Sequence, residues 1–353
     1  MARTHEFTGD YEALIEHYFE KGWTDGLPVV PPSPASLARM LASTARAPTD
    51  GVATIAPDGG AATVEAVAIN AILAGCLPEH FAVVLAAVEA IADEHLNLHA
   101  LQTTTNPAAV MLLVNGPIAR AIGINAKTNC LGPGTRANAV IGRAVRLVML
   151  NIGGGIPGAV DEATHGQPGK YTMCFAENED DTPWEPWHVE HGFAANESTV
   201  TAISVTGTQH VLDASSQDAA GIVQTLAGSC GNAGDLNAQI GGAPTLILGP
   251  EHAALLAKGG YTKAALKRAL YERARVPLAA FSADTVRQRV RERRSRYFAD
   301  GPDPVSVPVA DSAADINVIV AGGPGAHSVY CPSFGPSTMP TTRRIAARAD
   351  RRG

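Results

Sequence analysis

Three apolar segments in the second half of the chain decide the fold: T-V-T-A-I-S-V-T (199–206), T-L-I-L (245–248) and D-I-N-V-I-V-A (315–321). Their short length and their β-branched residues predict strands. Patterns with helical periodicity occupy the intervals, at about 217–227, 251–258 and 262–274. Strands that alternate with helices are typical of a layered α/β arrangement, so we expect a mostly parallel sheet in this half.

The first half is richer in alanine and in predicted helices. Pro34 suits the first turn of a helix at about 35–44. The segment A-V-M-L-L-V-N (109–115) predicts a core strand. Helical patterns also cover residues 10–22, 63–75, 80–95 and 135–151.

The pattern changes after the Trp-rich segment 183–193, which places a boundary near residue 195. We therefore expect an α/β protein in three parts. These are an Ala-rich mixed N-terminal domain (1–195), a C-terminal α/β domain (196–342) and a basic tail (343–353).

Composition argues against several classes of protein. The chain has 353 residues, 46% of them hydrophobic and 17% charged, which allows two domains with a sizeable core. Its net charge of −7 argues against nucleic-acid or anionic-membrane partners. The sequence contains no uncharged apolar run of about 18 residues, and residues 1–12 lack the apolar core of a secretory signal. Five widely spaced cysteines are typical of a reducing compartment, so we expect a cytoplasmic protein.

Polar side chains are concentrated between Asn97 and Glu179, within otherwise apolar segments. Examples are N-C-L-G-P-G-T-R-A-N-A-V-I-G-R (129–143) and D-E-A-T-H-G-Q-P-G-K-Y (161–171). Buried polar groups cost about 1–3 kcal/mol each when they lack a partner. The concentration therefore predicts a polar pocket with apolar walls, which is what a small-molecule site needs.

A Gly-Pro-Gly turn before a predicted helix indicates anion binding, because a helix N-terminus exposes backbone N–H groups. Arg136 and Arg143 are seven residues apart and share one stripe of that helix, with Arg146 one turn from Arg143. We expect the first two, with Asn129 and Asn138, to bind the substrate. Ion pairs with structural carboxylates are the alternative for the arginines.

The loop after this helix contains the residue types of an acid–base system. His165 and Glu177 are predicted to move protons, and Lys170 is predicted to hold an anion or polarise a carbonyl. A surface loop with ordinary charges is the alternative.

His188 and His191 have the H-x-x-H spacing of two metal-ligating imidazoles. A divalent metal is therefore one expected cofactor, and two surface or interface histidines are the alternative. We find no nucleotide-binding fingerprint in the sequence.

Several motifs resemble those of the UGSC-type (seleno)protein group, sometimes labelled thioredoxin-like. They lie mainly within residues 20–195: G-W-T-D-G-L-P-V-V-P-P, A-G-C-L-P-E-H, G-P-G-T-R-A-N-A-V-I-G-R-A, P-G-K-Y and A-E-N-E. Members carry Sec or Cys at the start of a U-G-S-C motif, and the matching segment here is A-G-S-C, with Ala227 in that place. The chain also lacks a C-x-x-C pair. The resemblance therefore implies a single candidate thiol, Cys230; a small apolar residue in a tight turn is the alternative.

The loop G-G-P-G-A-H-S (322–328) follows a predicted strand, and ligands of α/β sheets bind at the carboxyl ends of strands. We expect His327 to reach a cleft between the two halves, near Arg136 or His165. The sequence as a whole predicts a soluble enzyme that acts on a small polar or anionic molecule by hydrolytic, hydration or lyase chemistry, and that forms a homo-oligomer. A thiol-dependent redox enzyme using Cys230 and a non-catalytic small-anion-binding protein are the alternatives.

Overall fold

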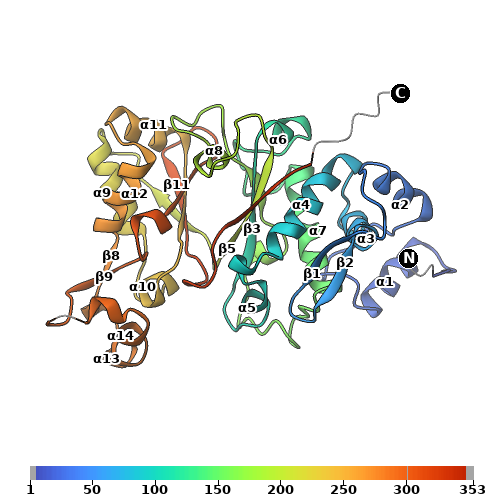
Figure 1. Cartoon of the computed structure of the whole chain (residues 1–353), viewed down its shortest axis with the longest axis horizontal. Coiled ribbons are helices and arrows are strands. Elements are labelled where there is room, and N and C mark those ends of the chain that lie inside the picture. Colours follow the sequence, from blue (N-terminus) through green and yellow to red (C-terminus); the bar gives the residue numbers. More distant parts are fainter. Residues whose placement is uncertain (1–4, 300, 347–353) are drawn as a thin grey trace.

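Two four-stranded sheets lie face to face in the centre of the protein, and helices cover their outer faces (Figure 1). The structure is a computed structural model that describes residues 5–299 and 301–346. Side chains from both sheets meet in one apolar cluster, to which Met111, Leu113 and Ile203 contribute from the first sheet and Ile247 and Ile319 from the second. The fold is therefore α/β, with the two sheets packed between helices.

The first sheet has the strand order β12–β5–β3–β4. β3 pairs in parallel with β4 and antiparallel with β5, which in turn pairs antiparallel with β12. Met111 and Leu113 of β3 face the second sheet, whereas Leu112 and Val114 face the helices. Because both faces are buried, this strand reads as a continuous apolar run. The bounds are β3 (Ala109–Asn115), β4 (Cys174–Ala176), β5 (Thr199–Val205) and β12 (Thr341–Arg344).

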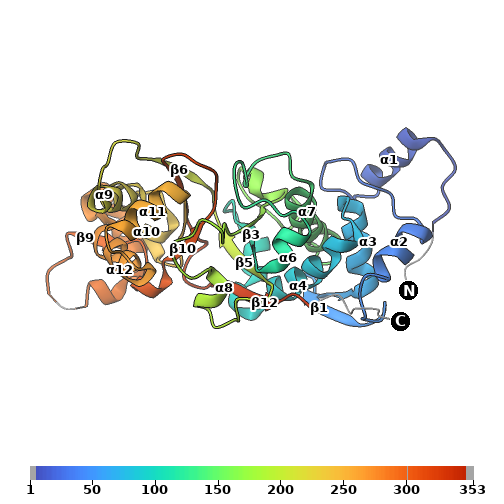
Figure 2. The same cartoon turned by 90° about the horizontal axis from the view of Figure 1, so that it is seen from above.

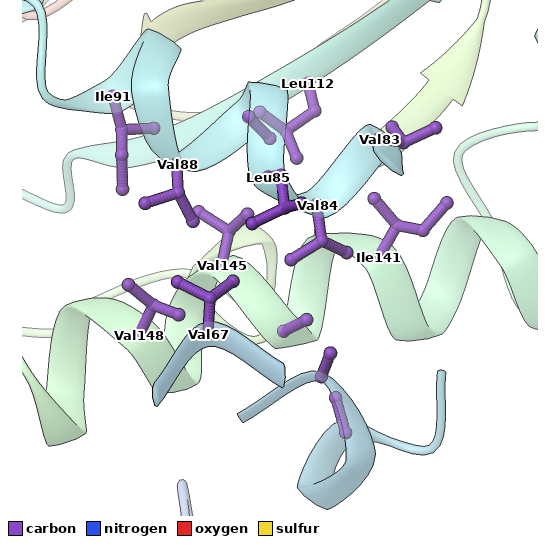
Figure 3. Close-up of a cluster of buried hydrophobic side chains, with 14 of the residues drawn as sticks. Val67, Val83, Val84, Leu85, Val88, Ile91, Leu112, Ile141, Val145 and Val148 are labelled. Atoms are coloured by element: carbon purple, nitrogen blue, oxygen red, sulfur yellow. The ribbon is translucent and has the colours of Figure 1, made fainter. Parts of the chain in front are cut away.

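Helices α4 (Phe81–Ile91) and α7 (Arg136–Asn151) cover the outer face of this sheet, and α3 (Val64–Ala74) packs against these two helices. Figure 3 shows their packing, in which Val84 and Val88 of α4 lie over Ile141 and Val145 of α7. Each such side chain stabilises the fold by about 1.5–3 kcal/mol when fully buried. Beyond these helices lie α1 (Tyr11–Glu20), α2 (Pro34–Leu41) and a hairpin of β1 (Gly51–Ile55) and β2 (Gly60–Thr63).

The second sheet has the order β10–β7–β11–β6, and only β10 and β7 are parallel. The prediction of a mostly parallel sheet is therefore wrong. Only six residues separate β10 from β11, too few for the crossover that parallel strands need. β11 instead turns back and pairs antiparallel with β7. The bounds are β6 (Gln209–Leu212), β7 (Thr245–Leu248), β10 (Asn317–Val320) and β11 (His327–Cys331).

Helices α9 (Ala219–Ser229), α11 (Pro250–Lys258) and α12 (Lys263–Arg273) cover the outer face of the second sheet (Figure 2). β8 (Arg275–Pro277) and β9 (Ser306–Pro308) form a separate two-stranded ladder. The short helices are α5 (Leu98–Gln102), α6 (Pro117–Ala121), α8 (Trp187–Glu190), α10 (Leu236–Ile240), α13 (Ala283–Thr285) and α14 (Arg291–Arg293).

The long predicted elements are confirmed. The strand expected at 109–115 and the helix expected at 135–151 match β3 and α7 to within one residue. The boundary expected near residue 195 falls between β4 and β5, which both belong to the first sheet. Of the expected basic tail, residues 343 and 344 belong to β12, and residues 347–353 lie outside the described residues. Within the described ranges, no helix is long and apolar enough to cross a membrane.

Candidate functional site

A cavity of about 1030 Å³ lies beside the C-terminal half of α7. Loop residues 24–26 and 157–171 form its other walls. Its lining contains the charged side chains of Arg146, Asp161 and Lys170, together with His165 and Tyr171. Among the described residues, those that line this cavity all belong to the first half of the chain.

Two cations converge on one carboxylate at this cavity. Lys170 Nζ lies 2.7 Å from Asp161 Oδ1 and 2.6 Å from Oδ2, and Arg146 Nη2 lies 3.5 Å from Oδ2. All three side chains are nearly buried, at 14% exposed or less. Burial lowers the pKa of Arg146, while the charge of Asp161 acts against that shift. Such a cluster of charges in a low-dielectric setting is costly to build, and it is typical of a functional site.

Local backbone structure positions the three groups. Arg146 lies on α7, and Asp161 closes a turn in which its N–H donates to the carbonyl of Ile156. Lys170 ends a short 3-10 turn that begins at Pro168, whose fixed φ suits that place. Gln167 donates from Nε2 to the carbonyls of Pro107 and Val205, which ties this loop to the amino end of β3.

The two arginines that we expected to bind substrate are engaged elsewhere. Arg143 makes two hydrogen bonds to Asp25, of 2.8 Å from Nε and 2.7 Å from Nη2, and also donates to the carbonyls of residues 27 and 28. Arg136 donates to the carbonyl of Gly75. The structure therefore favours the carboxylate alternative for Arg143, whereas Arg136 binds a backbone carbonyl. Arg146, one turn further along from Arg143, is the arginine at the cavity.

Asn129 and Asn138 also bind the backbone rather than facing the cavity. Asn138 is buried, accepts from the N–H of Asn125 and donates to the carbonyls of Asn125 and Cys130. Asn129 has a positive φ of 62° and donates to the carbonyl of Pro133. Asn129 thus holds the Gly-Pro-Gly turn, and Asn138 holds the loop that precedes it.

Glu177 does not meet His165. Its backbone N–H bonds to the carbonyl of Val114 near the carboxyl end of β3, whereas the loop of His165 is tied to the amino end. The expected acid–base pair is therefore divided between the two ends of the sheet. The sequence could not reveal this, because β4 is only three residues long and was not predicted.

Glu177 belongs to a buried polar cluster instead. Its Oε2 accepts from Asn115 Nδ2 and from the N–H of Trp187, both at 2.6 Å, and its Oε1 lies 3.9 Å from Lys263 Nζ of α12. Burial raises the pKa of Glu177, and the charge of Lys263 acts against the rise. Glu190 joins Lys263 at 3.0 Å and Lys267, so this cluster connects the two halves of the fold.

Unpartnered polar atoms gather in this cluster. The buried atoms without a hydrogen bond in the described structure include Asn115 Oδ1, Glu177 Oε1, Thr199 Oγ1 and both ring nitrogens of His188. Thr199 of β5 lies directly opposite Asn115 of β3 in the strand register. A cavity of about 470 Å³ borders the cluster, lined by Glu177, Glu179 and the loop 124–127.

The two histidines expected to bind a metal have different neighbours. His188 is fully buried, with Nδ1 3.8 Å from Glu179 Oε1. The His191 ring stacks on Trp187 at 4.0 Å, and its Nδ1 lies 2.7 Å from the Trp187 carbonyl. Across residues 5–299 and 301–346, no group of three or more His, Cys, Asp or Glu side chains is placed to hold a metal.

Cys230 and His327 lie in different surroundings from those we expected. Cys230 is buried in the core beneath the second sheet, and burial, with the nearby Asp235, raises its pKa. That environment disfavours the thiolate and so argues against the nucleophile. His327 is exposed and contacts His210 instead of Arg136 or His165, with 2.8 Å between Nδ1 and Nε2 of the two rings.

The loop before His327 does reach the first half of the chain. Gly322 donates to the carbonyl of Ala126, and Asn178 donates to the carbonyl of Val320. No protein-family model and no curated protein matches this chain. The resemblance to the UGSC-type group therefore stays a prediction.

Proposed function

We propose that this protein is an enzyme that acts on a small polar or anionic molecule by hydrolytic, hydration or lyase chemistry in the cavity around Lys170. The observation that carries the proposal is the convergence of Lys170 and Arg146 on the single carboxylate of Asp161 in a cavity of about 1030 Å³. A pocket with a few convergent polar groups is the usual form of a small-molecule site.

Charge supports an anionic ligand. Two cations face one carboxylate, so one positive charge is left uncompensated in this cluster. Asp25 and Glu162 also border the cavity, but Arg143 compensates the charge of Asp25, and Glu162 is exposed, so solvent screens its charge. A carboxylate or phosphate oxygen at Lys170 would gain a charge-assisted hydrogen bond, which is stronger in this nearly buried place than in water.

His165 supplies the proton chemistry in this proposal. It lines the same cavity on the loop between Asp161 and Lys170, and it is exposed enough to exchange protons with solvent. Adding or removing water requires that one proton is taken up and one is delivered, and imidazole does both near neutral pH. Lys170 would polarise the group that develops negative charge.

Non-catalytic retention of an anion remains the second candidate function. Asp161 already fixes both cations, and a preformed cationic pocket is sufficient for binding alone. Thiol-dependent redox chemistry loses its support because Cys230 lies in the core.

The experiment is calorimetric titration of the protein with small carboxylates and phosphate esters. Lys170→Met should weaken binding of the best ligand by about 10- to 150-fold, which corresponds to one charge-assisted contact. Lys127→Met is the matched control, since Lys127 is exposed and pairs with Asp180 at 3.2 Å. Equal affinities in the wild type and in Lys170→Met would refute the site.

His165→Gln then separates the two candidate functions. It should keep ligand affinity but lower turnover by about 10²–10⁴-fold if the protein is an enzyme. Binding without turnover in the wild type would favour the second function.

A further inference from the structure

Two exposed histidines stand side by side on neighbouring strands of the second sheet, away from the cavity of Lys170. His210 lies on β6 and His327 on β11. The distance from His210 Nε2 to His327 Nδ1 is 2.8 Å, and the ring centroids are 4.9 Å apart at an interplanar angle of 33°.

The strands hold this pair in a fixed register. His327 pairs with Leu212 and Val329 pairs with His210, so the two histidines are diagonal neighbours on one face of the ladder. β11 is itself held on its other side by β7, with Val329 opposite Ile247. Two side chains on a rigid ladder need little ordering before they bind a common ligand, which favours affinity.

We propose that His210 and His327 form a binding site for a divalent transition-metal ion of the Cu²⁺ or Ni²⁺ type. Imidazole nitrogen is a common ligand of these ions. At this distance one of the two ring nitrogens donates a hydrogen and the other accepts it. A metal ion replaces that hydrogen: the donor ring takes the tautomer that carries its proton on the other ring nitrogen, so both facing nitrogens become lone-pair donors and no net proton is lost.

The separation of the two nitrogens favours one coordination geometry over another. Two ligand atoms about 2.0–2.1 Å from a metal lie about 2.9 Å apart when they subtend a right angle, and about 3.3–3.4 Å apart in a tetrahedron. The observed 2.8 Å is the length of the present hydrogen bond, and the right-angled arrangement needs the smaller movement of the two rings from it. Right-angled ligand pairs are typical of the tetragonal coordination of Cu²⁺ and Ni²⁺, and Zn²⁺ prefers the tetrahedron.

The neighbourhood is acidic and accessible. Asp213 follows Leu212, the strand partner of His327, and hydrogen bonds from Thr225 and the Ser216 amide and hydroxyl hold the pKa of Asp213 at about 2. Glu251 accepts a hydrogen bond from the N–H of Gly325, two residues before His327. Because both imidazoles are exposed, the ion keeps its remaining ligands as water.

The test is titration of the purified full chain with Cu²⁺, followed by electron paramagnetic resonance and calorimetry. We expect one equivalent to bind with a two-nitrogen signature. The affinity for Cu²⁺ should fall at least about tenfold in His210→Ala and in His327→Ala, because each variant keeps one imidazole ligand instead of two that bind together. His99→Ala is the control, since His99 is exposed on α5 and should leave the affinity unchanged.

His210→Gln separates coordination from a simple cross-strand hydrogen bond. Glutamine can still donate a hydrogen bond to His327, so the fold should be retained while the two-nitrogen signature is lost. Unchanged Cu²⁺ affinity in both alanine variants, or the same loss in His99→Ala, would overturn the proposal. This outcome is independent of ligand binding at Lys170.

Discussion

Arg143 binds Asp25 through two parallel hydrogen bonds of 2.8 and 2.7 Å, and thereby joins α7 to a loop 118 positions earlier in the chain. The side chains are 14% and 3% exposed. Because Arg143 also donates to the carbonyls of residues 27 and 28, most of its donors are used within the fold. This contact fixes the loop that forms one wall of the Lys170 cavity.

Arg143→Met should therefore destabilise the protein. Removing one partner leaves the carboxylate of Asp25 buried without its counter-charge, which costs about 3–5 kcal/mol of unfolding free energy. Urea unfolding measures the loss, and Arg287→Met is the control because the exposed pair of Arg287 with Asp284 is worth about 0–1 kcal/mol. The double variant with Asp25→Asn should lose less than the sum of the single losses. If Arg143→Met weakened ligand binding but left the free energy of unfolding unchanged, Arg143 would be a substrate-binding residue instead.

Asp161→Asn should convert the cavity into a stronger anion site. The substitution leaves Lys170 and Arg146 nearly buried without a carboxylate, so the free energy of unfolding should fall in a buffer without multivalent anions. Added phosphate should restore stability more in this variant than in the wild type, because binding to the folded state stabilises it. Thermal unfolding over a phosphate series gives both quantities. An equal response in the two proteins would show that no anion binds between these cations.

The sequence predicts the elements whose apolar patterns are long and misses those that need partners. The apolar run A-V-M-L-L-V correctly predicts β3, and the apolar face of the helical pattern correctly predicts α7. Burial alone defines both elements. β11 (H-S-V-Y-C) and β6 (Q-H-V-L) contain polar residues, so their sequences do not predict strands. Both form strands by pairing with segments far away in the chain. Strand direction is equally non-local, which explains the wrong expectation of a mostly parallel sheet.

The candidate site was likewise predictable where local sequence decides it, and not where distant residues do. The polar loop that carries His165 and Lys170 was predicted from its Gly-Pro content and its residue types, and both residues line the cavity. Helix spacing showed that Arg143 and Arg146 are near each other, but it could not show which arginine meets which carboxylate. That assignment depends on Asp25 and Asp161, whose positions are set by turns on either side of α7.

Glu177→Gln should change how stability depends on pH. Burial raises the pKa of Glu177 in the folded state above its ordinary value of 4.5. The folded protein therefore holds this proton more tightly than the unfolded chain, and the contribution of Glu177 to stability is lost as pH rises from about 4.5 through the folded-state pKa. The stability of the wild type relative to Glu177→Gln should consequently fall between acidic and neutral pH. Urea unfolding at several pH values measures this difference, and a rise with pH would contradict the assignment.

The five cysteines should be unreactive in the folded protein. All are free and buried, and burial raises the pKa of Cys130 to about 11 and of Cys174 and Cys331 to about 12, with Cys76 and Cys230 raised further. Since the thiolate is the reacting form, titration with an aromatic disulfide reagent at neutral pH should detect little rapid reaction until denaturant exposes all five.

Cys130 should react first as denaturant is added, because it lies in a turn outside the helices and strands and its pKa is raised least, and mass spectrometry identifies the labelled residue. Cys230→Ser serves as the control and should leave the native rate unchanged. Rapid labelling of Cys230 in the native wild type would instead revive the thiol-dependent alternative. Such labelling would require local unfolding at the carboxyl end of α9 that exposes the Cys230 side chain, because the folded core around Cys230 disfavours its thiolate.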